Sequence, residues 1–333
     1  MLIAAAAATA MRLPSSSATC TFTCCCAIVS SASSGSAFLT RPSTSRPNSS
    51  AMADPSTHSV TSQASRASAL AGARAASSAS AASGTTGVDV AANLAEVRTK
   101  IAGKVSECNR PEGSVRLVAV SKTKPVELLM DAYNAGQRSF GENYAQELVS
   151  KAAELPPDIS WHFIGPLQSN KAAPLVKNVG LPKLACVETV ATMKLANKLN
   201  NAVENLENYE GSEDDKKLGI YLQVNTSGEE SKSGLAPGEE LISLAKDITA
   251  NCPRLSIDGL MTIGAPGDLG CFDTLVKCRE DVAEALGLDS VDTLDLSMGM
   301  SGDYPDAIER GATSVRVGST IFGARDYSNL NKK

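Results

Sequence analysis

The sequence predicts an α/β fold, a closed (β/α)8 TIM barrel with an extra helix before the first strand. Eight short apolar runs alternate with helical segments across residues 89–333, a length that suits one large domain. A doubly wound open sheet is the alternative. No GxGxxG motif follows the first apolar run, and this weakens the alternative.

The predicted strands are short, apolar, and followed by polar residues and glycines. They cover residues 115–121, 139–141, 160–165, 183–188, 218–225, 257–263, 293–297 and 314–318. The first of them, in VRLVAVSKTKP, changes from apolar to basic within a few residues.

Helical periodicity fills the segments between these strands. In 239–250 the apolar residues share one face, and Pro237 suits the first helical position. A second apolar stripe covers 195–202. Asp303 is expected to cap a short helix that starts at Pro305 and stops at Gly311, and the extra helix covers about 91–107.

Residues 1–88 consist mostly of Ala, Ser and Thr, with five arginines, no lysine and Asp54 as the one acidic residue. This composition is typical of an organelle transit peptide, so we expect a disordered leader at 1–88 and a single domain at 89–333. The expected organelle is the plastid, with the mitochondrion as the alternative and the cytoplasm if translation starts at Met52. A low-complexity tail with no address is the other interpretation.

Charge and composition argue against several classes of function. The chain has a formal net charge of −5, and the acidic residues concentrate in 89–333, which argues against nucleic acid as a partner. No apolar stretch reaches the roughly 18 residues of a membrane span. The two histidines, His58 and His162, are too few for a multi-histidine metal site.

Five cysteines are scattered through residues 89–333, and we expect them to be reduced thiols because none forms a CxxC pair. They are Cys108, Cys186, Cys252, Cys271 and Cys278.

Lys122 lies just after the first predicted strand, at the end of the barrel where active-site groups collect. It is either an exposed strand-end lysine or a lysine that forms a Schiff base. Lys124 and Arg316 are cationic neighbours that would favour the neutral amine needed for that reaction. The spacing alone leaves both interpretations open.

Small polar residues and glycines follow the seventh and eighth predicted strands, where barrels of this type often bind phosphate. Ser297, Gly299, Gly318 and Ser319 offer backbone N–H groups and hydroxyls to an anion. A phosphate site together with Lys122 suggests a phosphorylated aldehyde as cofactor.

Seven motifs of the chain occur in an order that resembles one known family. They are AVSKTKP (119–125), FGENYAQE (140–147), WHFIGPLQSNK (161–171), SGEESKSGL (227–235), GLMTIG (259–264), LSMGMSGDY (296–304) and VRVGSTIFG (315–323). Together they resemble the pyridoxal-phosphate homeostasis protein family, also called the proline-synthase co-transcribed homologue family, over nearly all of residues 90–326.

The resemblance implies a barrel like the N-terminal domain of alanine racemase, with pyridoxal 5′-phosphate as cofactor. It implies that Lys122 forms the Schiff base and that Arg316 faces the pyridine nitrogen. Ser297, Gly318 and Ser319 match phosphate-binding positions. The positions that match the pocket lining are Asn143, His162 and Met261, although Met261 also suits the core and His162 also suits a hydrogen-bonded barrel histidine.

The resemblance implies a non-catalytic carrier that holds the cofactor as a lysine aldimine, serves intracellular vitamin B6 homeostasis and supplies apo-enzymes. We expect a monomer that binds neither nucleic acid nor membrane. An amino-acid racemase is the alternative, but it needs a second base, and the spacing of Tyr144, Tyr221 and Tyr304 recommends none of them. A guanidinium beside the ring nitrogen disfavours its protonation and so favours the carrier.

Overall fold

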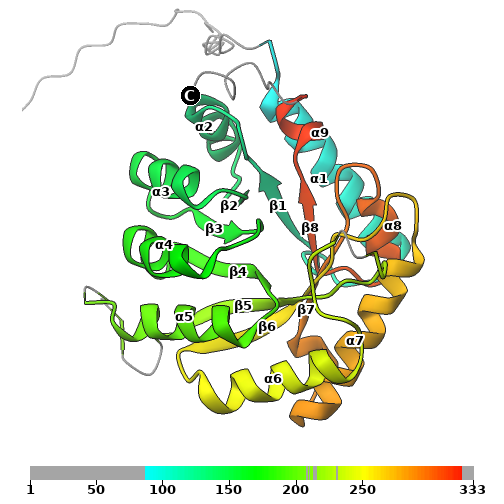
Figure 1. The fold of residues 1–333 in the computed structure, drawn as a ribbon. Coiled ribbons are helices and arrows are strands. Elements are labelled where there is room, and N and C mark those ends of the chain that lie inside the picture. The colour runs from blue at the N-terminus through cyan, green and yellow to red at the C-terminus, as the bar shows by residue number, and fades with distance from the viewer. Residues whose placement is uncertain (1–86, 208, 210, 213–215, 230–231, 325–333) are drawn as a thin grey trace, which may run out of the picture. The chain divides into compact units, whose positions relative to one another are not determined.

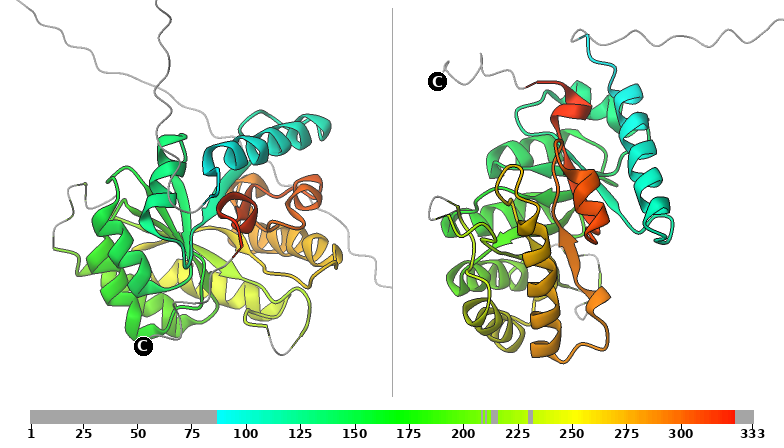
Figure 2. Two further views of the ribbon diagram at one scale, coloured as in Figure 1. Left: turned by 90° about the horizontal axis from the view of Figure 1, so that it is seen from above. Right: turned by 90° about the vertical axis from the view of Figure 1, so that its right-hand side faces the viewer.

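The computed structural model describes residues 87–324, apart from residues 208, 210, 213–215 and 230–231. In this part of the chain, eight parallel strands close into a barrel in the order β1 to β8, with helices around it (Figures 1 and 2). The predicted (β/α)8 barrel is therefore confirmed. The predicted leader lies almost wholly outside the described residues, and the division at residue 88 stays a prediction.

Each of the eight strands overlaps one of the predicted strands, and the boundaries differ by a few residues. The strands are β1 (Arg116–Val120), β2 (Ser139–Glu142), β3 (Ser160–Phe163), β4 (Leu184–Val190), β5 (Leu218–Gln223), β6 (Leu255–Met261), β7 (Asp295–Ser297) and β8 (Ser314–Val317). Pairing of β1 with β8, with Ala119 opposite Val317, closes the barrel. Closure brings the residues that follow these two strands to the same rim.

The helices follow the strands as expected for this fold, and the extra first helix is present. They are α1 (Val90–Glu107), α2 (Val126–Asn134), α3 (Ala145–Glu154), α4 (Ala172–Val179), α5 (Met193–Glu204), α6 (Glu239–Asn251), α7 (Gly270–Leu286), α8 (Tyr304–Glu309) and α9 (Ser319–Phe322), with 3-10 turns at Ser169–Lys171 and Val291–Thr293. None of the helices in this part of the chain has the length and hydrophobicity that a membrane crossing requires.

Two details of the predicted helix starts are wrong. Pro237 lies in the turn before α6, because Gly238 with φ 99° takes the N-cap position. Asp303 precedes α8 as expected, but the helix begins at Tyr304. The Asp303 carboxylate accepts the N–H of Met300 at 2.6 Å and no N–H of the helix, so Asp303 stabilises the preceding loop.

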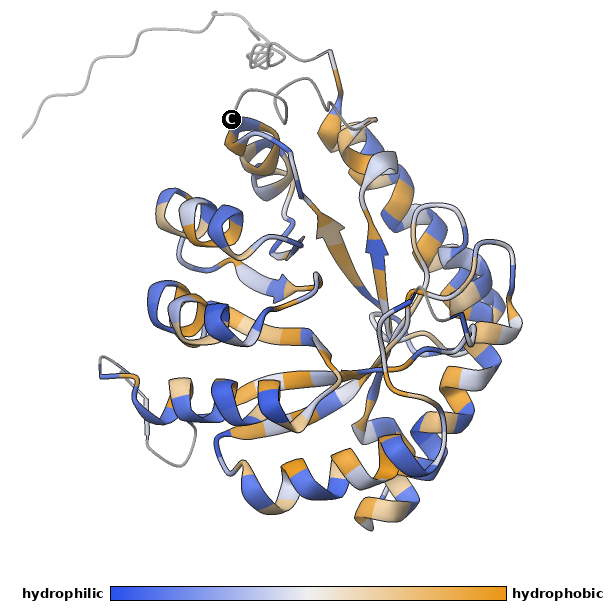
Figure 3. Ribbon diagram, viewed as in Figure 1, coloured by the Kyte–Doolittle hydropathy of each residue, from blue (hydrophilic) through white to orange (hydrophobic). Residues whose placement is uncertain are grey.

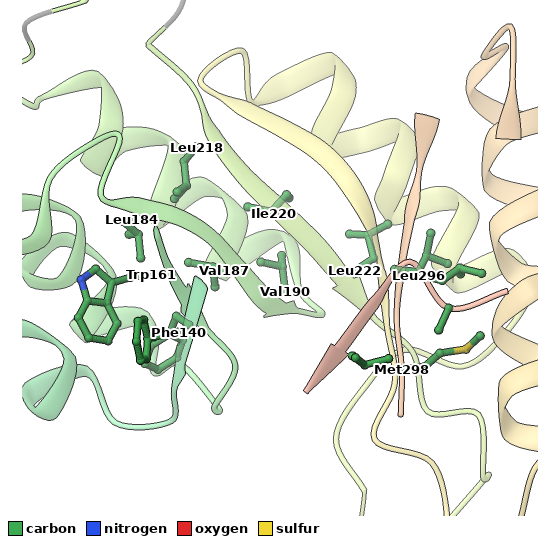
Figure 4. Packing of buried hydrophobic residues seen from close by; sticks show 14 of the residues in the cluster. Phe140, Trp161, Leu184, Val187, Val190, Leu218, Ile220, Leu222, Leu296 and Met298 are labelled. Carbon is green, nitrogen blue, oxygen red and sulfur yellow. The ribbon is translucent and has the colours of Figure 1, made fainter. Parts of the chain in front are cut away.

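The main hydrophobic core lies between the barrel and its helices. Figure 3 shows β4 as largely hydrophobic, and it shows helices that alternate between hydrophobic and hydrophilic residues, as expected for helices with one face on a sheet. Phe140 and Trp161 pack with their ring centroids 5.8 Å apart and extend the core that Figure 4 shows. On β5, Ile220 and Leu222 join this core, whereas Tyr221 between them belongs to a separate buried cluster with Cys186 and Met261.

The interior of the barrel holds polar side chains in addition to this small cluster. Near the start of β1, Arg116 donates to Asp295 Oδ2 at 2.9 Å, and the hydroxyl of Tyr221 donates to the same oxygen at 2.6 Å. These bonds neutralise the carboxylate at the end of the barrel where the strands begin.

Candidate functional site

A cavity of about 310 Å³ opens where the strands end, and Lys122 is part of its wall. Its size falls within the range of about 300–1,000 Å³ that is typical of small-molecule sites. Lys124 and Arg316 also line it, and no acidic residue does so among the described residues. The cavity is therefore suited to an anion.

The structure brings six of the nine predicted site residues to this wall, from β1, β2, β6 and β8 or the turns that follow these strands. They are Lys122, Asn143, Met261, Arg316, Gly318 and Ser319. The lysine and the proposed phosphate turn thus share one cavity, as the sequence predicts. Met261 is both core and lining: it is 1% exposed and belongs to the cluster inside the barrel.

Gly318 allows the turn after β8 to approach the end of β1. A Cβ atom at this position would lie 3.2 Å from the carbonyl oxygen and 3.3 Å from the Cβ of Val120. The N–H of Gly318 donates to Ser301 Oγ at 3.1 Å, and α9 begins at Ser319. The first N–H groups of a helix have no partner inside it, so they remain available to an anion.

The structure does not place His162, Ser297 or Gly299 in the wall of the cavity. The contact with a cofactor that the sequence predicts for these three residues stays a prediction. Gly299 has φ 89° and packs against α8, where a Cβ atom would lie 2.6 Å from the Cβ of Ala307. His162 and Ser297 belong to strands, along which side chains point alternately to the two faces of the sheet, and both point into the barrel. There they contact residues that lie below the cavity and support it.

Arg316 is held in a fixed position by two bonds from its guanidinium group. Nη1 donates to Ser297 Oγ at 2.6 Å, and Nη2 donates to the carbonyl oxygen of Thr262 at 2.7 Å. Burial lowers the pKa of Arg316, whereas the nearby Glu188 carboxylate raises it. An arginine keeps its charge in proteins, so a fixed positive charge lies at the bottom of the cavity.

Glu188 supplies the negative charge below this arginine. Its Oε2 accepts the hydroxyl proton of Ser297 at 2.5 Å, and its Oε1 lies 2.9 Å from His162 Nδ1. Burial alone would raise the pKa of Glu188, but the bonds from His162 and Ser297 and the charge of Arg316 outweigh burial and lower it. Glu188 is therefore an ionised carboxylate inside the barrel, and it completes a chain of bonds from His162 to Arg316.

Cys186 lies beside this chain, with Sγ 3.0 Å from His162 Nδ1. Burial and the negative charge of Glu188 raise the pKa of the Cys186 thiol well above its usual value, so the thiol is unreactive. Ligand atoms of His162, Cys186 and Glu188 lie within 4.8 Å of one another. They would have to give up these hydrogen bonds to hold a metal ion. The cysteines of 87–324 form no disulfide.

Sequence reasoning missed Ser301 and Glu188. Ser301 lines the cavity and belongs to the LSMGMSGDY motif, which directed attention to Ser297 and Gly299 instead. Only the loop conformation distinguishes the three positions. Glu188 lies within the apolar run of β4, and an acidic residue inside a buried strand was the available signal.

Lys124, expected as a cationic neighbour of Lys122, also has a structural role. Its ammonium group donates to the carbonyl oxygens of Phe322 at 2.9 Å, Gly323 at 3.0 Å and Ala324 at 2.6 Å. These carbonyls follow α9, so Lys124 fixes the end of the short helix whose first residue lines the cavity.

The wall of the cavity fits a phosphorylated aldehyde such as pyridoxal phosphate. Asn143 Oδ1 is buried in this wall without a hydrogen-bond partner, which is costly unless a ligand supplies a donor. Lys122 offers an amine to an aldehyde, and Ser319, next to Gly318, offers its N–H group and its hydroxyl to a phosphate.

A closed parallel barrel with a lysine after its first strand and a cationic cavity at that rim defines the alanine racemase N-terminal class of barrels. The family model for the alanine racemase N-terminal domain matches residues 89–326. Alanine racemase from Clostridium difficile 630 has the same fold: it is 14% identical with a TM-score of 0.52, covering 73% of this chain and 59% of that chain.

Within this class, the chain belongs to the pyridoxal phosphate homeostasis protein family. It is 44% identical over 253 residues to the pyridoxal phosphate homeostasis protein of Homo sapiens, which covers 73% of this chain and 88% of the human protein. PipY of Synechococcus elongatus PCC7942, solved with PLP bound, is 32% identical with a TM-score of 0.55, covering 70% of this chain and all (100%) of that chain.

Proposed function

We propose that this protein binds pyridoxal 5′-phosphate and serves intracellular vitamin B6 homeostasis. One observation carries the proposal: Lys122, Arg316 and the Gly318–Ser319 turn line a single cavity. These groups suit the aldehyde, the ring and the phosphate of the cofactor, respectively. The names of the relatives and the PLP-bound structure of PipY support the same conclusion.

Lys122 is proposed to hold the aldehyde carbon covalently, as a Schiff base. The carbon–nitrogen double bond forms while the aldehyde oxygen leaves as water, so no further reactant is needed. Only a neutral amine can attack, and neighbouring cations such as Lys124 and Arg316 favour that form. The N–H groups at the start of α9 and the hydroxyl of Ser319 bind the phosphate.

Arg316 favours a carrier over a catalyst. Pyridoxal phosphate acts as an electron sink in amino-acid chemistry, most strongly when its ring nitrogen is protonated. Arg316 cannot turn away from the ring, because Ser297 and Thr262 hold both of its terminal nitrogens. A fixed guanidinium beside the ring nitrogen disfavours a second positive charge there. The pocket therefore holds the cofactor without activating it.

The positions of the three tyrosines support the same choice. Tyr144 is 55% exposed and precedes α3, Tyr304 packs in the core, and Tyr221 is bonded to Asp295. In the described part of the chain, no tyrosine lines the cavity. A racemase built on this barrel would need a second base, and the described tyrosines do not supply it. We propose transfer of the cofactor to apo-enzymes by a monomer instead.

Spectroscopy and mass spectrometry test the proposal. The purified full-length protein, mixed with pyridoxal phosphate, is expected to develop a Schiff-base absorption band. Reduction with borohydride, digestion and mass spectrometry should then place the cofactor mass on Lys122. A protein that stays colourless, or a cofactor mass found only on other lysines, overturns the Schiff-base assignment. Incubation with L-alanine, followed by chiral analysis, tests for racemisation, and rapid loss of chirality would overturn the carrier role.

A further inference from the structure

A buried ion triad supports the turn that carries Lys122. Lys151 of α3 is 5% exposed, and its ammonium group donates to Glu142 Oε1 and Glu147 Oε1, each at 2.7 Å. Its third bond, at 2.8 Å, goes to the carbonyl oxygen of Ser121. An ammonium group has three donors, so Lys151 uses all of them on two carboxylates and one backbone carbonyl.

The same triad contacts the residues on both sides of Lys122. On one side, the hydroxyl of Ser121 donates to Glu142 Oε1 at 2.7 Å. On the other side, the backbone N–H of Thr123 donates to Glu147 Oε1 at 2.7 Å. Lys122 therefore lies between two residues whose positions are fixed by charged groups.

Thr123 adopts an unfavourable backbone conformation in this turn. Its φ is 61°, in the left-handed region, where a β-branched residue is a genuine outlier. Such strain persists only where the surroundings enforce it, and it concentrates at functional sites. Two contacts hold Thr123 in this conformation: the bond from its N–H to Glu147 at 2.7 Å, and the backbone bond from the Lys124 N–H to the Ser121 carbonyl oxygen at 3.0 Å, which closes the turn.

We propose that Lys151, Glu142 and Glu147 are positioning residues that direct the side chain of Lys122 into the cavity by keeping Thr123 in its left-handed conformation. This inference rests on the proposed function, because it concerns the presentation of the Lys122 amine. It assigns to α3 a role in covalent capture although none of the three residues lines the cavity.

The composition of the triad supports positioning over simple stability. Well-packed apolar side chains are often at least as stabilising as a buried ion pair, so a triad retained only for stability would be a poor solution. Apolar side chains, however, offer no acceptor to the Thr123 N–H and no donor to the Ser121 carbonyl. The charged groups satisfy both backbone positions, and the single ammonium group of Lys151 bonds to both carboxylates.

Glu147→Ala in the full-length protein removes the acceptor of the Thr123 N–H, and this carboxylate is the most exposed member of the triad. Two ligands separate positioning from folding. Pyridoxal phosphate reports covalent capture through the rate at which the Schiff-base band appears. Pyridoxine 5′-phosphate has an alcohol in place of the aldehyde and reports only the non-covalent grip on ring and phosphate. Glu154→Ala, on the exposed part of the same helix, is the matched control.

We expect Glu147→Ala to slow covalent capture by about tenfold to a hundredfold, because small misplacements of a reacting group have effects of this size. Affinity for pyridoxine 5′-phosphate should stay close to that of the parent, whereas the melting temperature should fall somewhat because Lys151 loses one of its partners. Thr123→Gly, which adopts a left-handed conformation without strain, should restore most of the lost rate when combined with Glu147→Ala.

The outcomes are distinguishable. If the parent fails to capture pyridoxal phosphate, the proposed function fails. If the parent reacts but Glu147→Ala reacts equally fast, the positioning role is wrong. It is also wrong if capture rate, analogue affinity and melting temperature fall together, or if Thr123→Gly gives no rescue. If Glu147→Ala does not fold, Glu147→Leu takes its place under the same criteria, because it also removes the acceptor of the Thr123 N–H but keeps most of the side-chain volume.

Discussion

Arg316 donates a hydrogen bond to Ser297 Oγ at 2.6 Å, and both side chains are buried. The hydroxyl proton of Ser297 points the other way, to Glu188. Ser297 thus links a buried cation to a buried anion. Its side chain serves the arginine that supports the cavity, and the sequence-based expectation that it binds phosphate gains no support from this geometry.

Ser297→Ala should destabilise the fold by about 1–3 kcal/mol, because Arg316 Nη1 and Glu188 Oε2 each lose a buried hydrogen-bond partner. Unfolding in urea measures this loss. Ser314→Ala is the matched control: Ser314 pairs with Ser297 across β7 and β8, is equally buried, and has no partner for its hydroxyl. This control should change stability little or raise it. Equal losses in the two variants would contradict the link between Arg316 and Glu188.

The lowered pKa of Glu188 predicts how the free energy of unfolding depends on pH. Hydrogen bonds from His162 and Ser297 and the charge of Arg316 lower the pKa of Glu188 below its ordinary value of 4.5, against the effect of burial. A carboxyl group with a lowered pKa in the folded state contributes stability above pH 4.5, and the contribution disappears as the pH falls through the folded-state value. The free energy of unfolding should therefore decrease on acidification below this point.

Glu188→Gln tests that assignment by urea unfolding at a series of pH values. The variant should be less stable at pH 7, and its stability should depend less steeply on pH in the acidic range, because one titrating group is gone. Glu154→Gln removes an exposed carboxylate of α3 and should leave the acid dependence unchanged. An acid slope in Glu188→Gln equal to that of the parent would show that Glu188 does not carry the effect.

The composition of residues 1–88, the predicted leader, predicts the compartment in which the protein is located. We propose that residues 1–88 direct import into plastids, because they are rich in Ala and Ser, carry arginines and contain one acidic residue. A fluorescent protein fused after residue 88 should accumulate in plastids of leaf cells, whereas a fusion that starts at Met52 should remain in the cytoplasm. Accumulation of the longer fusion in mitochondria, or its diffuse distribution, would contradict the plastid assignment.

The sequence was sufficient to predict the barrel and the cavity rim, for a reason that Lys122 and Gly318 illustrate. Lys122 lies two residues after the end of β1 and Gly318 directly follows β8, and the fold brings the carboxyl ends of all strands to one rim. Strand order and closure thus place them together without any knowledge of side-chain conformation. Their shared cavity needs only the pairing of β1 with β8.

The support below the cavity was harder to predict. The family resemblance assigned His162 to the pocket lining, and Ser297 was assigned to a phosphate site for its place at the end of a strand. Alternation along each strand directs both side chains into the barrel, toward Glu188. Ser301 and Thr123 depend on loop conformation, which periodicity does not determine. Glu147, 24 residues later in the sequence, accepts the Thr123 N–H and supports this left-handed turn together with the backbone bond from Lys124 to Ser121.

Ser301 offers a test of phosphate binding that depends on loop geometry alone. Its hydroxyl lies in the cavity wall and accepts the N–H of Gly318 at 3.1 Å, so it both orders the phosphate turn and stands beside it. Hydrogen bonds to charged groups contribute about 1.5–3 kcal/mol, so Ser301→Ala should weaken binding of pyridoxal phosphate by roughly tenfold or more. Binding of pyridoxal, which has no phosphate, should change little in the same absorbance titration. Thr320→Ala, one residue beyond the cavity wall, is the control. An equal loss of affinity for both ligands in Ser301→Ala would show that the phosphate binds elsewhere.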